Sequence, residues 1–179
     1  FPVIHSRPAA YLAPFLEHKA VRVYRGDLTD DNFLRTLPRA DLIIHAAGSG
    51  EPGKFMADAL SSLKINTSTT FKLFEKLVGK GTFLFISSSD IYGGLKPGKY
   101  SEDQIGTTNT DHPRACYIEG KRTGETICGL YRRQGVKAYS VRLSAVYGPG
   151  GRSGAQRARP SFIRKGLGGK IDLLDAGEA

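Results

Sequence analysis

The chain has 179 residues, of which 40% are hydrophobic and 24% are charged. This composition is typical of a globular protein, and the length supports one substantial core rather than two. No apolar run approaches the roughly 20 residues that a membrane-spanning helix needs. The two cysteines, Cys116 and Cys128, have neither a CxxC spacing nor a nearby pair of histidines. This argues against a metal site or a disulfide framework and favours a reducing, cytoplasmic location.

The formal net charge is +9, from 26 basic and 17 acidic side chains. A solvated basic surface and an attraction to a polyanion, such as nucleic acid or a phosphorylated small molecule, would both explain it. The basic residues are dispersed apart from a cluster at 151–159, and aromatic residues do not interleave with them. The pattern therefore argues against a nucleic-acid partner.

Short β-branched runs alternate with stretches of helical pattern along the whole chain. We predict strands at residues 3–5, 21–24, 42–45, 83–86, 137–142 and 171–174, and helices at 8–17, 30–38, 57–78, 113–134 and 160–168. This alternation predicts an α/β fold, a Rossmann-like doubly wound parallel sheet with helices on both faces. Small and polar residues follow several of the strands, at the edge where such sheets bind ligands.

Residues 117–121 read YIEGK and place a lysine four positions after a tyrosine. A Tyr-x-x-x-Lys pair alone is weak evidence, and a second match at residues 92–96, YGGLK, lies in a glycine-rich loop. Around Tyr117 the context differs, because Pro113 suits a first helical turn and Gly135 suits the helix end. On that helix Tyr117 and Lys121 would share one face, one turn apart. The pair is either surface decoration or part of an acid–base site.

The chemistry of an acid–base site favours this spacing. A free tyrosine has a pKa of about 10, too high for a base near neutral pH. An ammonium about 5 Å away would stabilise the phenolate by roughly 3 kcal/mol, about two pKa units. Three hydroxyls, Ser87, Ser88 and Ser89, follow a buried strand and could hold a substrate oxygen beside the phenol. Alone, such a serine run would more simply cap a loop.

These stretches resemble the extended short-chain dehydrogenase/reductases, in particular the NAD-dependent nucleotide-sugar epimerases, dehydratases and decarboxylases. The matching motifs, in order, are GDLTD (26–30), DLIIHAAG (41–48), KINTSTT (64–70), SSSDIYGG (87–94), YIEGK (117–121) and RLSAVYGPGGR (142–152). Each motif is only modestly specific, but their order and spacing together are strong evidence. The resemblance covers nearly all of the chain. The resemblance implies a bound NAD and a nucleotide-sugar substrate.

The resemblance also implies roles for particular residues. Tyr117 would be the base, Lys121 would orient the nicotinamide ribose and lower the tyrosine pKa, and Ser88 would bind the reacting oxygen. The other residues implied at the cofactor are Asp27, Leu28, Ala46, Ala47 and Gly48, with Asn66 as the structural asparagine of the family.

The second strand of NAD-binding members usually ends in an acid that binds the adenine ribose. Counting from Val3, this position holds Arg7, which could instead bind a 2′-phosphate. NADP therefore stays open as the cofactor, and so does an Arg7 that simply points to solvent.

Residues 113–126, PRACYIEGKRTGET, are most similar to the UDP-glucuronic acid decarboxylase branch of the family. That branch has a Thr-Ser-Glu trio where this chain has Ser88, Ser89 and Asp90. The 4,6-dehydratases place an Asp-Glu pair after their threonine, so Ser89 argues against a dehydratase. Asp90 is one methylene shorter than the decarboxylase glutamate, and it is a fourth candidate catalytic residue.

We therefore expect a UDP-glucuronate decarboxylase-like enzyme that oxidises the sugar transiently at C4. Alternatives are a 4-epimerase or 4,6-dehydratase of the same family, an NADPH-dependent keto-sugar reductase, which Arg7 would favour, and a non-catalytic dinucleotide-binding sensor. The complete Ser88, Tyr117 and Lys121 set argues against the sensor. The resemblance further implies a homodimer that pairs the helix at 57–78 and the helix that carries Tyr117.

We expect residues 1–150 to form a partial NAD(P)-binding Rossmann domain and 151–179 to begin the substrate-binding region. The glycine-rich turn of a dinucleotide-binding unit is not found ahead of Val3. We therefore expect the first strand–helix unit and most of the substrate domain to lie outside this sequence.

Overall fold

The computed structural model describes residues 1–5, 12–144 and 146. Its strands are β1 Val3–Ile4, β2 Tyr24–Arg25, β3 Ala40–His45, β4 Leu77–Ser88 and β5 Lys137–Leu143. Its helices are α1 Ala13–Leu16, α2 Asp31–Thr36, α3 Pro52–Ala57, α4 Ala59–Asn66, α5 Ser68–Phe74 and α6 Ala115–Arg133, with a 3₁₀ turn, η2, at Ser89–Tyr92.

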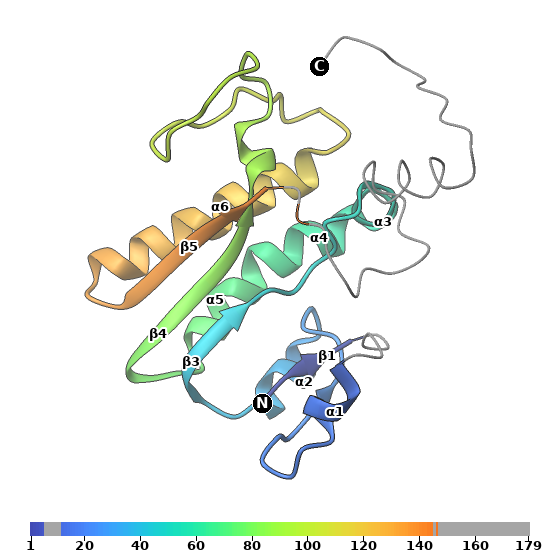
Figure 1. The fold of residues 1–179 in the computed structure, drawn as a ribbon, viewed down its shortest axis with the longest axis vertical. Helices are drawn as coiled ribbons and strands as arrows, with labels where there is room; N and C mark the ends of the chain where they lie inside the picture. The colour runs from blue at the N-terminus through green and yellow to red at the C-terminus, as the bar shows by residue number, and fades with distance from the viewer. Residues whose placement is uncertain (6–11, 145, 147–179) are drawn as a thin grey trace.

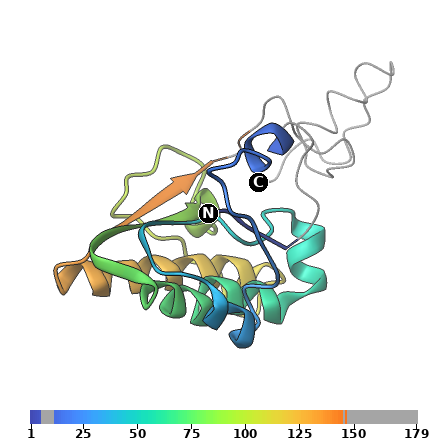
Figure 2. The ribbon, with the colours of Figure 1, turned by 90° about the horizontal axis from the view of Figure 1, so that it is seen from below.

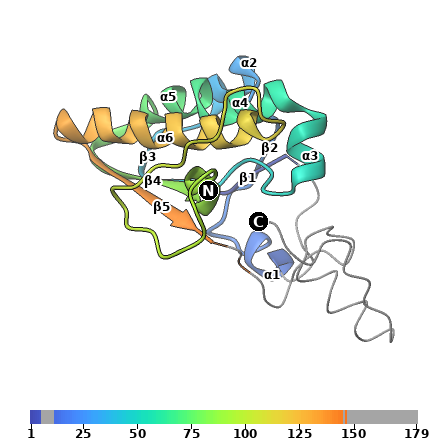
Figure 3. The same ribbon diagram turned by 90° about the horizontal axis from the view of Figure 1, so that it is seen from above.

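All strand pairs are parallel. Strands β1 and β2 form one two-stranded sheet, and β3, β4 and β5 form a second with β4 in the centre. Helices α2 to α6 lie on one side of the strands and α1 lies on the other (Figures 1 and 3). The predicted Rossmann-like parallel α/β fold is confirmed. Parallel strands collect their carboxyl ends at one edge, so Ser88 at the end of β4 lies at the edge where such sheets bind ligands.

The core lies between β4 and the helix layer, which Figure 2 shows as a slab against one face of the sheet. Along β4 the side chains alternate between the two faces. Phe83 and Phe85 point to the helices and are completely buried. Phe74 of α5 stacks on Phe83 and on Tyr131 of α6, with 3.9 Å between ring centroids in each pair. These contacts fix α5 and α6 against β4.

The side of the sheet away from α6 is less covered within the described residues. Exposed apolar side chains there include Leu42 and Ile44 of β3 and Tyr139 and Val141 of β5. None of the helices in the described ranges is both long and apolar enough to cross a membrane.

Helix α6 matches its prediction closely, with one difference at its start. Arg114 is the N-cap residue, so Pro113 lies just before the helix rather than in its first turn. At the other end Gly135 has φ +86°, a conformation that glycine adopts without strain and that stops the helix. The glycine-rich segment 92–96 is not a helix beyond Tyr92, as predicted.

The predicted helix at 57–78 is wrong in its extent. It is two helices, α4 and α5, joined at Thr67, whose φ of −113° and ψ of −90° are not helical. The last predicted positions, Leu77 and Val78, instead begin β4, which pairs with Ala40 at its first residue. The short α3 was not predicted, because its Pro52 and Gly53 suggest a loop. Predicted segments 160–168 and 171–174, residues 8–11 and the region 151–179 lie outside the described residues.

Candidate active site

Lys121 is buried between α6 and β4. Its side chain is 5% exposed, and its Nζ donates a 2.7 Å hydrogen bond to the carbonyl oxygen of Ile86. The Nζ also lies 4.9 Å from the ring centroid of Phe85 and 5.7 Å from that of Tyr117. Burial lowers the pKa of Lys121 to about 8. The predicted pairing of Tyr117 and Lys121 on one face is therefore observed, and the lysine ties α6 to β4 two residues before Ser88.

The ring of Tyr117 is held by a contact that the sequence analysis missed. Tyr117 is 7% exposed and stacks face to face on Phe55 of α3, with 4.5 Å between centroids and 9° between ring planes. The guanidinium of Arg114 lies over the Phe55 ring, 5.8 Å from its centroid. Phe55 and Tyr117 are far apart in the chain, so no local pattern indicates their contact.

Ser88 is the last residue of β4 and is buried. Its Oγ accepts a 3.2 Å hydrogen bond from the backbone N–H of Asp90, which caps the 3₁₀ turn. This capping role was the simpler explanation of the serine run. An acceptor role leaves the hydroxyl hydrogen for another oxygen, so capping and substrate binding are compatible. Ser87 lies on the helix-facing side, and its Oγ is buried without a hydrogen-bond partner among the described residues.

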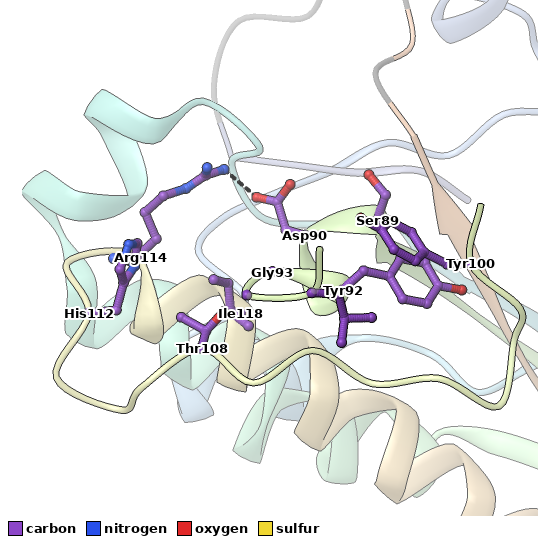
Figure 4. A pocket seen from close by; sticks show the side chains of 11 residues that line it. Ser89, Asp90, Tyr92, Gly93, Tyr100, Thr108, His112, Arg114 and Ile118 are labelled. Atoms are coloured by element: carbon purple, nitrogen blue, oxygen red, sulfur yellow. Dashed lines mark hydrogen bonds and ion pairs between the residues drawn. The ribbon is translucent and has the colours of Figure 1, made fainter. Parts of the chain in front are cut away.

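Asp90 lines an open pocket of about 350 Å³ beside η2. Its carboxylate forms an ion pair with Nη2 of Arg114, drawn as a dashed line in Figure 4. Both side chains are partly exposed. The pocket is lined by Ser89, Asp90, Tyr92, Gly93, Gly94, Leu95, Tyr100, Thr108, His112, Arg114 and Ile118. It therefore combines a carboxylate, a guanidinium and an imidazole, from Asp90, Arg114 and His112, with two stacked tyrosine rings.

The loop that forms this pocket is anchored by Arg142 of β5, another residue that the sequence analysis did not single out. Its guanidinium binds the carboxylate of Glu125 on α6, with Nη2 2.8 Å from Oε2. It also donates to the hydroxyl of Tyr92 at 2.8 Å and to the carbonyl oxygen of Glu102 at 2.7 Å. The bonds to Glu125 and, to a smaller extent, to Tyr92 raise the pKa of Arg142. Arg142 opens the RLSAVYG motif, a signal that could have identified it.

On the predicted adenine side, Asp27 follows β2 in a tight polar turn. Its Oδ1 accepts hydrogen bonds from the backbone N–H of Thr29 at 2.7 Å and from the Thr29 hydroxyl at 2.9 Å. The backbone bond is the main cause that lowers the Asp27 pKa. The carbonyl oxygen of Leu28 accepts from Thr69 of α5, which attaches this turn to the helix layer. Arg7 lies outside the described residues.

Small residues follow β3 at the same edge of the sheet. Ala46 and Gly48 are exposed and Ala47 is partly buried, and Gly48 has φ +110°, which only glycine adopts readily. Asn66 of α4 is buried close by, and its Nδ2 donates to the carbonyl oxygen of Ser62. Its Oδ1 has no partner among the described residues. This edge therefore leaves room for a ligand to come close to the protein backbone.

The chain matches the model of the NAD dependent epimerase/dehydratase family over residues 3–179. It is 35% identical over 168 residues to UDP-glucuronic acid decarboxylase 1 of Xenopus tropicalis, covering 92% of this chain but 39% of that relative. The chain thus spans well under half the length of this relative.

Two solved structures are similar in fold. UDP-glucuronic acid 4-epimerase of Bacillus cereus, in complex with UDP-glucuronic acid and NAD, has a TM-score of 0.72 at 23% identity. That match covers 94% of this chain and 55% of the epimerase chain. RMD of Pseudomonas aeruginosa, complexed with NADPH, has a TM-score of 0.61 at 27% identity over 80% of this chain and 51% of that one. The family match extends over nearly the whole sequence, and the chain therefore belongs to the NAD dependent epimerase/dehydratase family.

Proposed function

We propose that the whole protein oxidises a nucleotide sugar transiently at C4 and acts as a UDP-glucuronate decarboxylase. The observation that carries the proposal is the buried Tyr117–Lys121 pair, fixed on β4 just before Ser88. The 35% identity to a UDP-glucuronic acid decarboxylase supports the choice of reaction within the family.

The residues after β3 fit a dinucleotide. Exposed Ala46 and Gly48, together with Ala47, leave space where a larger side chain would block a pyrophosphate or a ribose. Asp27 and Leu28 would lie on the adenine side, and Lys121 would bind the nicotinamide ribose. NAD bound there would supply the acceptor and later the donor of the C4 hydride. NADP stays an alternative, because an arginine at position 7 could bind its 2′-phosphate.

In this mechanism Tyr117 takes the proton of the C4 hydroxyl as the C4 hydrogen leaves. The Lys121 ammonium near the ring favours the phenolate, since opposite charges attract strongly where water is excluded. With a pKa of about 8, Lys121 is mostly charged at neutral pH. The Ser88 hydroxyl would donate to the C4 oxygen while it becomes a ketone. Stabilising that oxygen costs little reorganisation because Ser88 is already held by its bond to Asp90.

In a uronic acid, the new C4 ketone is β to the C6 carboxylate. The C5–C6 bond breaks, CO₂ leaves, and its electron pair stays on C5 as an enolate that the C4 ketone stabilises. C5 is then protonated, and the C4 hydrogen returns to give a pentose. Asp90 is the candidate that steers protonation at C5, and its ion pair with Arg114 would hold the carboxylate in position.

The second candidate is a 4-epimerase, which would share the first step and then rotate the keto sugar. The shorter carboxylate of Asp90, already paired with Arg114, favours this alternative because it reaches less far than a glutamate. The experiment is to incubate the full-length enzyme with UDP-glucuronic acid. The decarboxylase releases CO₂ and forms a UDP-pentose, and Tyr117→Phe as the control does neither at a comparable rate. A C4-inverted uronic acid without CO₂ would replace the decarboxylase by the epimerase.

We propose further that the protein works in the cytoplasm as a homodimer. Exposed apolar side chains gather on α4 and α5: Leu60, which is 85% exposed, with Leu63 and Phe71. Leu130 of α6 is also exposed. A second copy packing on these helices would remove them from water. In sedimentation of the full-length protein, Leu60→Asp should shift the dimer toward monomer and Lys99→Asp, on the exposed loop, should not. A monomeric wild type would exclude the dimer.

A further inference from the structure

We propose that Phe55 is a positioning residue that holds the Tyr117 ring in its reactive orientation. The proposal rests on the proposed function for its kinetic part, because it assumes that Tyr117 transfers the proton. The stacking of the two rings is a separate claim, and it can be tested without measuring enzyme activity.

The contact between the two rings is extensive. The ring planes are nearly parallel, at 9°, with centroids 4.5 Å apart, and Phe55 is 2% exposed. Such pairs contribute about 0.5–1.5 kcal/mol beyond the burial of their area. On α6 the Lys121 ammonium is 5.7 Å from the same ring. The Tyr117 ring therefore contacts a flat apolar surface from α3 and lies near a fixed charge from α6.

Phe55 is itself held from two directions. The guanidinium of Arg114 lies over its ring, 5.8 Å from the centroid, and the Sγ of Cys116 donates to its carbonyl oxygen at 3.6 Å. Both of these residues belong to the start of α6, so α3 is attached to the same turn that carries Tyr117. Arg114 also pairs with Asp90. One arginine thus links the aromatic stack to the carboxylate in the pocket.

A proton-transferring group is sensitive to small displacements. A shift of about 1 Å at a reacting group can reduce the rate about 100-fold. Helix α3 has only six residues and no side-chain cap at its N-terminus, so its position depends on tertiary contacts. Removing the Phe55 ring would free one face of Tyr117 while leaving its backbone position on α6 unchanged. The phenol would then sample orientations in which it cannot reach the C4 hydroxyl.

The test uses full-length protein with Phe55→Ala, Phe55→Tyr and, as a matched control, Phe74→Leu. Phe74 is also a buried, stacked aromatic residue, but its partners are Phe83 and Tyr131. Phe55→Ala should lower kcat at least about tenfold with a smaller change in KM. Phe55→Tyr keeps a flat ring and should restore most of the rate. Phe74→Leu should lower stability without lowering kcat to the same extent.

Tyrosine ring signals in proton NMR provide the readout that is independent of activity, with Tyr117→Phe to assign the Tyr117 signal. The ring current of Phe55 shields the Tyr117 ring protons, so their signals should move downfield in Phe55→Ala and stay in place in Phe74→Leu. An unmoved Tyr117 signal in Phe55→Ala would disprove the stack. A moved signal with an unchanged kcat would disprove the positioning role. An inactive wild type would refute the proposed function and leave the NMR result on the stack intact.

Discussion

The two sides of the N-terminal end of α6 are built differently. On one side Tyr117 and Lys121 are buried against β4 and aromatic rings, and Lys121 donates a buried hydrogen bond to the carbonyl oxygen of Ile86. On the other side Asp90 and Arg114 form a partly exposed ion pair in an open pocket. In the mechanism we propose, the buried side would carry out the oxidation at C4. Differences between reactions would arise in the pocket, because loops at the surface of a fold commonly carry such differences.

The largest expected effect comes from the buried side. Tyr117→Phe removes the hydroxyl that we propose transfers the proton but keeps the ring that stacks on Phe55. We expect kcat to fall at least about 100-fold, the usual scale for loss of a general acid–base. The thermal unfolding midpoint and the dinucleotide affinity should stay close to those of the wild type. Turnover near the wild-type rate, measured at saturating UDP-sugar, would show that Tyr117 is not the base.

The packing of α6 on β4 can be tested with two glycines of the same helix. A Cβ at Gly124 would lie 2.2 Å from Cζ of Phe85, so Gly124→Ala must displace a buried ring. We expect it to destabilise the protein by about 1–3 kcal/mol.

Gly129 provides the matched control, because the nearest atoms to a Cβ there are Nη1 of Arg133 at 3.7 Å and Nη2 of Arg132 at 4.0 Å, both at the ends of flexible side chains. Gly129→Ala should leave stability unchanged or raise it by up to about 1 kcal/mol, since alanine favours the helix. Urea unfolding of both variants gives the comparison. Equal stability of the two would mean that α6 does not pack this closely on Phe85.

On the exposed side, we expect a substitution to change the rate of the reaction more than the stability of the protein. Asp90→Asn keeps the shape of the side chain but removes the charge that pairs with Arg114. We expect CO₂ release to fall about tenfold, less than the 10²–10⁴-fold contribution of a full general acid–base, because Asp90 only steers the protonation at C5. Loss of a partly exposed ion pair should cost no more than about 1 kcal/mol of stability. A variant that loses stability but keeps its rate of CO₂ release would identify Asp90 as a purely structural residue.

A pH dependence of stability should arise from the burial of Lys121. Its pKa in the folded protein is about 8, below its ordinary 10.5. Between these pH values the unfolded chain binds more protons than the folded one, so this group makes stability rise with pH. Below pH 8 both states are charged and the penalty is constant.

The free energy of unfolding of the wild type should therefore increase relative to that of Lys121→Met as the pH is raised from about 8 toward 10.5. Chemical denaturation of both proteins across this range measures the difference. Parallel stability curves would mean that the lysine is not held in a low-dielectric site.

The sequence was informative where local signals decide the structure. The Tyr117–Lys121 register followed from helical periodicity and from Gly135, and the parallel strands followed from short β-branched runs. The extent of β4 was missed because Gly79, Lys80 and Gly81 at its start do not resemble a strand.

The contacts that complete the candidate site could not be predicted in this way. Phe55 meets Tyr117, and Arg114 meets Asp90, only after α3, η2 and α6 have packed together. Nothing near these residues in the sequence signals either contact. Arg142 is an intermediate case, because its motif was recognised while its role as the loop anchor depends on tertiary structure.

The most direct test of the central claim, transient oxidation at C4, uses UDP-glucuronic acid that carries deuterium at C4. If the hydrogen at C4 is removed and returned within one active site, turnover by the full-length enzyme should be slowed by the label. The UDP-pentose product should still carry deuterium at C4. Product that forms at the same rate with and without the label, or that has exchanged its deuterium for solvent hydrogen, would contradict the account.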